Sequence, residues 1–154
     1  MTFVLSDFIH SVASETVWYQ ANPGNAGDAL IAEATIQLFE DLGEDYRIVS
    51  PDDDLRDRIV IYGGGGNLTG DYHFAARFVL AHHINAKKLI VLPHTITGHE
   101  ELLGSLGKNV TLIAREPKTY EHIRRVAPRA ENLLSEDLAF SLDLNRLFAT
   151  PSMG

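Results

Sequence analysis

Arg115 is the residue whose position in this sequence best suits the binding of an anionic substrate, because it directly follows the apolar run 109–114. A guanidinium group held at the end of a strand can bind a carboxylate or a phosphate through two parallel hydrogen bonds. An ion pair within the protein, with Asp137 or Glu116 as the partner, is the alternative. The sequence alone leaves both interpretations open.

Four consecutive glycines, residues 63–66, and the Asn67 that follows them form a second candidate site at the end of the apolar run 58–63. Gly64, Gly65 and Gly66 allow another group to come close to the backbone, and exposed N–H groups in such a turn can bind a phosphate. Close packing of strand and helix, or an ordinary loop, is the alternative. The tract is neither a Walker A loop nor a GxGxxG fingerprint with an acid about 20 residues further on. A nucleotide-binding oxidoreductase is therefore disfavoured.

The motif "NAGDALI", residues 25–31, has the composition of a helix start. Gly27 allows a tight turn there, and Asp28 can cap the helix by accepting hydrogen bonds from its free N–H groups. An anionic ligand at the same helix end would compete with Asp28 for the positive end of the helix dipole. We therefore expect a scaffold role for Asp28 and a ligand role for Asn25.

His94 and Thr95 lie in "LPHTITG", residues 92–98, after another apolar run. A histidine in such a place is a candidate general acid or base, and a purely structural histidine is the alternative. No pair of histidines has the HExxH spacing of a zinc site, and the sequence has no GxSxG elbow. We expect no metal site.

The pattern of apolar residues predicts the elements that position these side chains. Short, continuous, β-branched runs are typical of strands buried on both faces, and segments with helical spacing lie between them. The expected strands are residues 16–21, 46–50, 58–63, 88–93, 109–114 and the weaker 132–135, and the expected helices are residues 28–43, 71–86 and 116–128. Strands that alternate with helices predict an α/β fold, a Rossmann-like doubly wound, mostly parallel sheet with helices on both faces. We expect one such domain over residues 1–154.

The carboxyl ends of parallel strands meet at one edge of a sheet, where open α/β sheets bind their ligands. The residues expected to converge there are Asn25, Gly64, Gly65, Asn67, His94, Thr95, Arg115 and Asp137. We expect this edge to be the functional site.

The composition limits the class of protein. The chain has 154 residues, a formal net charge of -8 and no cysteine. This acidity argues against binding to nucleic acid or to a membrane surface, and the absence of cysteine excludes thiolate catalysis and fits a reducing compartment. No segment approaches the roughly 20 apolar residues of a membrane span, and the first residues lack the basic region of a signal peptide. We expect a cytoplasmic protein.

Five motifs taken together are more specific than any one of them. "NAGDALI", "YGGGGNL", "VLPHTI", "LIAREPKTYEHI" and "SEDLAFSL", in this order and spacing, resemble the amino-terminal half of the polysaccharide pyruvyl transferase family. The resemblance covers residues 16–142. It implies one half of a two-domain, glycosyltransferase-B-like architecture with the active cleft between the halves.

The resemblance also implies an activity, the transfer of a pyruvyl group from phosphoenolpyruvate to a sugar of an exopolysaccharide or cell-surface glycan, with formation of a ketal. Phosphoenolpyruvate is then the donor substrate and no cofactor is expected. The candidate catalytic residues are His94, Arg115 and Asp137. The candidate substrate-binding residues are Asn25, Gly27, Asp28, Gly64, Gly65, Gly66, Asn67 and Thr95.

The family's second half usually contributes an Arg-x-His motif, and this sequence has none. The resemblance therefore implies a partner, either a second domain or another copy in a homo-oligomer, and we expect little activity from this chain alone. Two other functions stay open: a non-catalytic Rossmann-like domain that binds a nucleotide-sugar or glycan, and one half of a glycosyltransferase.

Overall fold

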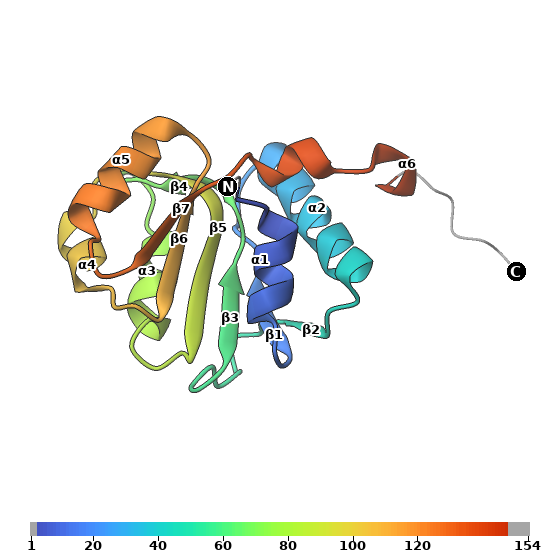
Figure 1. Ribbon diagram of the computed structural model, residues 1–154, viewed down its shortest axis with the longest axis horizontal. Coiled ribbons are helices and arrows are strands. Elements are labelled where there is room, and N and C mark those ends of the chain that lie inside the picture. Colours follow the sequence, from blue (N-terminus) through green and yellow to red (C-terminus); the bar gives the residue numbers. More distant parts are fainter. Residues whose placement is uncertain (1–2, 148–154) are drawn as a thin grey trace, which may run out of the picture.

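The computed structural model describes residues 3–147, and these form an open α/β sheet (Figure 1). The strands are β1 (Val17–Gln20), β2 (Tyr46–Ile48), β3 (Ile59–Tyr62), β4 (Gly65–Leu68), β5 (Lys88–Ile96), β6 (Val110–Ala114) and β7 (Glu131–Leu134). Their order is β2-β1-β3-β5-β6-β7, β4 pairs with the end of β5, and all pairs are parallel. The predicted Rossmann-like class is confirmed.

The central strands form because their side chains are apolar on both faces of the sheet. Every residue of β3 and of β6 is buried. Val60 and Tyr62 of β3 pack into one core cluster, whereas Ile59 and Ile61 pack into the other. The continuous apolar runs in the sequence therefore reflect two cores, one on each side of the sheet.

Helices cover both faces. The structure has α1 (Leu5–Val12), α2 (Ala26–Leu42), α3 (Phe74–His82), α4 (Glu100–Ser105), α5 (Pro117–Val126), the 3₁₀ helix η1 (Leu138–Ser141) and α6 (Leu144–Leu147). Side chains of α1, α2 and η1 pack into one core cluster, and those of α3, α4 and α5 into the other, as the two sides of Figure 1 show. The three predicted helices are confirmed with shifted ends, and α1, α4, η1 and α6 were not predicted.

The sequence suggested that the glycine tract forms a turn or a loop, but in the structure the tract ends in a strand. Its last two glycines begin β4, which extends the sheet along β5, and none of residues 63–66 has a positive φ. A Cβ on Gly64 would lie 2.6 Å from the Pro93 carbonyl oxygen, and one on Gly66 would lie 2.7 Å from Arg115 Nη2. The glycines are therefore required because other parts of the same chain come close to this backbone.

Within residues 3–147, no helix is both long enough and apolar enough to cross a bilayer.

Candidate functional site

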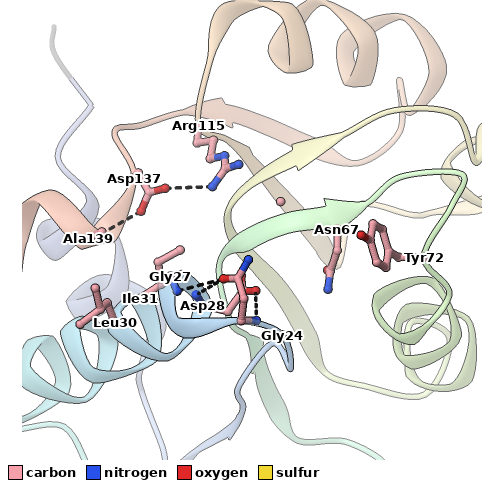
Figure 2. A pocket seen from close by; sticks show the side chains of 12 residues that line it. Gly24, Gly27, Asp28, Leu30, Ile31, Asn67, Tyr72, Arg115, Asp137 and Ala139 are labelled. Carbon is pink, nitrogen blue, oxygen red and sulfur yellow. Dashed lines mark hydrogen bonds and ion pairs between the residues drawn. The ribbon is translucent and has the colours of Figure 1, made fainter.

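A cavity of about 460 Å³ lies at the carboxyl edge of the sheet (Figure 2). Its lining residues are Gly24, Asn25, Gly27, Asp28, Leu30, Ile31, Gly66, Asn67, Tyr72, Arg115, Asp137 and Ala139. Seven of the residues singled out in the sequence are among them: Asn25, Gly27, Asp28, Gly66, Asn67, Arg115 and Asp137. Gly64, Gly65, His94 and Thr95 lie at the same edge but do not line the cavity.

Arg115 directly follows β6, and its guanidinium group is held from two sides. Its Nη1 donates a hydrogen bond to Asp137 Oδ2 at 3.0 Å, and its Nε donates to Thr95 Oγ1 at 2.7 Å. Glu116 adds a longer ion pair, with Oε2 3.6 Å from Nε. The internal ion pair is therefore real. Among the residues described, Nη2 has no hydrogen-bond partner, so both of its N–H groups are available to a ligand.

Thr95 positions Arg115 from beneath the cavity. Its hydroxyl group accepts the Arg115 bond and donates one to Glu116 Oε2 at 3.0 Å. The Thr119 hydroxyl also donates to Glu116, and it accepts a bond from the Ile96 N–H at 3.1 Å. Glu116 was expected only as a possible ion-pair partner of Arg115, and its hydrogen bonds to Thr95 and Thr119 were not predicted. A threonine one helical turn after Glu116 was the available signal.

Asn25 is the N-cap of α2, a role that the sequence assigned to Asp28. Asn25 Oδ1 accepts hydrogen bonds from the N–H groups of Gly27 at 2.9 Å and Asp28 at 3.3 Å. Asp28 Oδ2 accepts in return from the Asn25 N–H at 3.1 Å, which completes a capping box. The N-cap assignment to Asp28 was wrong because Asp28 is the third helical residue, but its scaffold role is confirmed. The ligand role of Asn25 stays a prediction.

Two buried residues that the sequence did not single out support Asp28 from below. The hydroxyl group of Tyr62 donates to Asn22 Oδ1 at 2.6 Å, and Asn22 Nδ2 donates to Asp28 Oδ1 at 3.4 Å. Burial, followed by the nearby Asp28 charge, raises the pKa of Tyr62 well above its usual range, so the phenol keeps its proton and remains a donor. Tyr62 lies at the end of β3 and Asn22 lies just after β1. These positions at strand ends were the signal that could have identified them.

His94 is fully buried beneath Asn67. Its Nε2 lies 3.4 Å from Asn67 Oδ1, and it donates there when Nε2 carries the proton. Asn67 Nδ2 donates in turn to the Pro23 carbonyl at 3.2 Å, so the amide is held at both ends. Burial and then the Arg115 charge lower the pKa of His94 to about 3, so the imidazole is neutral at physiological pH. In this arrangement His94 reaches the cavity only through Asn67.

The charges of the cavity lining do not favour an anion. Asp28 and Asp137 contribute two carboxylates against the one guanidinium of Arg115, which leaves one negative charge in excess. No group of three or more metal-ligating side chains occurs in the described part of the chain. The lining offers hydrogen-bond acceptors, amide groups and one cationic nitrogen, which together suit a polyhydroxylated ligand.

These features describe a Rossmann-like α/β protein with a polar cavity at the carboxyl edge of its sheet. The family model for polysaccharide pyruvyl transferase matches residues 25–151, and the chain belongs to that family. An uncharacterized protein from Klebsiella pneumoniae, known from its crystal structure, is similar to the chain with 30% sequence identity and a TM-score of 0.82. That alignment covers 94% of this chain and 58% of the Klebsiella protein, so the chain spans a little over half of that protein's length. No curated protein matches the chain.

Proposed function

We propose that this chain is part of a transferase that moves a pyruvyl group from phosphoenolpyruvate to two hydroxyl groups of a sugar in an exopolysaccharide or cell-surface glycan. The strongest support is the convergence of residues from four separate family-like motifs on one cavity, within a chain of this family. These residues are Asn25, Asn67, Arg115 and Asp137, and each follows or belongs to a different strand at the carboxyl edge.

The reaction sets clear chemical requirements. One sugar hydroxyl oxygen adds to C2 of phosphoenolpyruvate while C3 takes up a proton and becomes a methyl group. The second hydroxyl oxygen then displaces phosphate from C2, which closes the ketal and releases its proton. A catalyst must align the two hydroxyl groups, accept their protons and stabilise the departing phosphate.

The residues of the cavity suit the first of these requirements, the alignment of the two hydroxyl groups. Asp137 and Asp28 can accept hydrogen bonds from sugar hydroxyl groups, and Asn67 presents an amide that is already fixed at both ends. Arg115 Nη2 can hold the carboxylate of phosphoenolpyruvate through a charge-assisted bond. Because the lining carries an excess negative charge, the uncharged sugar fits it better than the phosphate does.

The cations that assist phosphate departure then come from outside this chain's cavity. A second unit that faces the carboxyl edge would supply them, either further sequence of the same protein or a partner chain. The alignment with this chain covers 58% of the Klebsiella protein, so that protein is long enough to contain such a unit as well.

The proposal is tested by comparing the full-length gene product with the chain of residues 1–154. Each is incubated with phosphoenolpyruvate and methyl β-galactoside, and the ketal product is detected by mass spectrometry. We expect turnover by the full-length product and little by the shorter chain. Efficient turnover by the shorter chain would overturn the requirement for outside cations. If neither turns over and neither binds phosphoenolpyruvate, the non-catalytic binding domain is the better account.

A further inference from the structure

Tyr72 is an aromatic side chain at the cavity. It belongs to none of the five sequence motifs and to none of the ion pairs described above. It follows β4 in the connection to α3, is 59% exposed and lines the cavity. Figure 2 shows its ring beside Asn67, at the end of the cavity away from Arg115 and Asp137. One end of the cavity is therefore ionic, and the other combines an amide with an aromatic ring.

The backbone that carries Tyr72 is anchored. The Tyr72 N–H donates to the Thr69 carbonyl at 3.3 Å, which closes a turn, and the His99 ring donates to the same carbonyl at 2.7 Å. Asn67, the neighbour of the ring, is fixed by the Pro23 carbonyl and by His94. The ring and the amide thus form one wall of the cavity, in which the amide and the backbone that carries the ring are held in place before a ligand binds.

Exposure alone does not identify a binding residue, since single apolar side chains on a surface are common. Phe140 is 83% exposed and does not line this cavity. Tyr72 differs because its ring borders a cavity that also contains fixed hydrogen-bonding groups and no excess of positive charge. A purely apolar ligand would leave these groups unpaired, and an anion would meet two carboxylates.

A pyranose ring matches this wall. The C–H bonds on one face of the sugar carry a slight positive polarisation and can pack on the negative face of an aromatic ring. The hydroxyl groups at its edge can both donate to Asp28 and accept from Asn67. In galactose the axial 4-hydroxyl leaves the opposite face with an apolar patch of C–H bonds, which makes it a suitable probe.

On the basis of the function proposed above, we infer that Tyr72 is the stacking platform for the acceptor sugar. The ring of the sugar packs on Tyr72, and its reacting hydroxyl pair points toward the Arg115–Asp137 end of the cavity. Tyr72 would then set the acceptor specificity of the enzyme without taking part in the chemical step.

The test is the affinity of the full-length protein for methyl β-galactoside, measured by NMR titration without phosphoenolpyruvate. The variants are Tyr72→Ala, Tyr72→Phe and, as a control, Phe140→Ala, with circular dichroism to confirm that each is folded. We expect Tyr72→Ala to weaken binding about tenfold, because an aromatic stacking contact has about this effect. Tyr72→Phe and Phe140→Ala keep the stacking surface and should bind as the unmodified protein does.

Unchanged binding by Tyr72→Ala would overturn the inference and leave the proposed transferase intact. The inference is also overturned if the unmodified protein binds no galactoside, or if the shifted NMR signals lie away from residues 66–72. The transferase proposal is judged separately by ketal formation. A protein that forms the ketal but binds the sugar independently of Tyr72 would refute the stacking role and leave the transferase proposal standing.

Discussion

Replacing Arg115 by alanine should reduce the specificity constant for phosphoenolpyruvate much more than it affects the Michaelis constant for the sugar. The guanidinium group uses Nε and Nη1 for Thr95 and Asp137, at 2.7 Å and 3.0 Å, and leaves Nη2 for the donor substrate. A hydrogen bond between charged groups contributes about 1.5–3 kcal/mol. Losing one such bond lowers kcat/KM for phosphoenolpyruvate by about 10- to 150-fold.

The same substitution also destabilises the fold, and this effect must be separated from ligand binding. Asp137 has a 19% exposed side chain and would lose its cationic partner while keeping the Ala139 N–H bond. We expect a loss of about 1–3 kcal/mol in the free energy of unfolding. Arg115→Lys keeps a positive charge but lacks the planar fork that binds Thr95 and Asp137 together, so it should restore little of either property.

The assay is steady-state kinetics with each substrate varied in turn, together with urea unfolding of the same samples. Arg56→Ala is the control, since Arg56 forms an ion pair with Asp54 on the exposed surface away from the cavity. This control should leave both kinetics and stability nearly unchanged. If Arg115→Ala loses stability yet keeps its kcat/KM for phosphoenolpyruvate, Arg115 is a structural ion pair and our reasoning about Nη2 is refuted.

Substitutions at three further positions test the surroundings of the cavity. Gly66→Ala should displace the guanidinium group of Arg115, because the added Cβ would lie 2.7 Å from Nη2. A crystal structure of the variant should show longer hydrogen bonds from Arg115 to Thr95 and Asp137, and an unmoved side chain would contradict this. Asn25→Ala should cost about 1 kcal/mol in urea unfolding through loss of the α2 cap, whereas Asn25→Asp should cost little; equal losses would refute the capping role. His94 has a pKa lowered to about 3, so its contribution to stability is complete above its unfolded pKa of about 6.5 and is lost as the pH falls from there toward 3. His94→Gln should remove this pH dependence while keeping a donor for Asn67, and the prediction fails if the NMR signals of the native imidazole titrate between about pH 5 and 8.

The fold was largely predictable because its strands are buried on both faces. Residues 59–62 are continuously apolar, residues 110–114 are apolar apart from Thr111, and no helix with a solvated face has that pattern. The ends of helices were predictable where a residue has a special backbone role: Gly43 ends α2 with a φ of 67°, and Pro117 begins α5. Helix α4 has only six residues, too few for a periodic pattern to show.

The lining of the cavity was predictable in part, and the hydrogen bonds and close contacts between its residues were not. Asn67 and Arg115 were identified because each lies where a strand was expected to end. The close approach of Arg115 to Gly66, and of Pro93 to Gly64, joins segments that are distant in sequence. For the same reason the sequence did not show that the last two glycines of the tract belong to a strand. Tyr72 was missed because the residues around it in the sequence do not distinguish an aromatic side chain at a cavity from one in a core.

The most direct test of the account is the stoichiometry of the reaction catalysed by the full-length protein. Phosphate release and ketal formation are measured in one sample that contains phosphoenolpyruvate and methyl β-galactoside, and again with either substrate left out. We predict one phosphate released for each ketal formed, and neither product when a substrate is missing. Phosphate release that continues without the sugar, or sugar that is modified without phosphate release, would contradict pyruvyl transfer at this cavity.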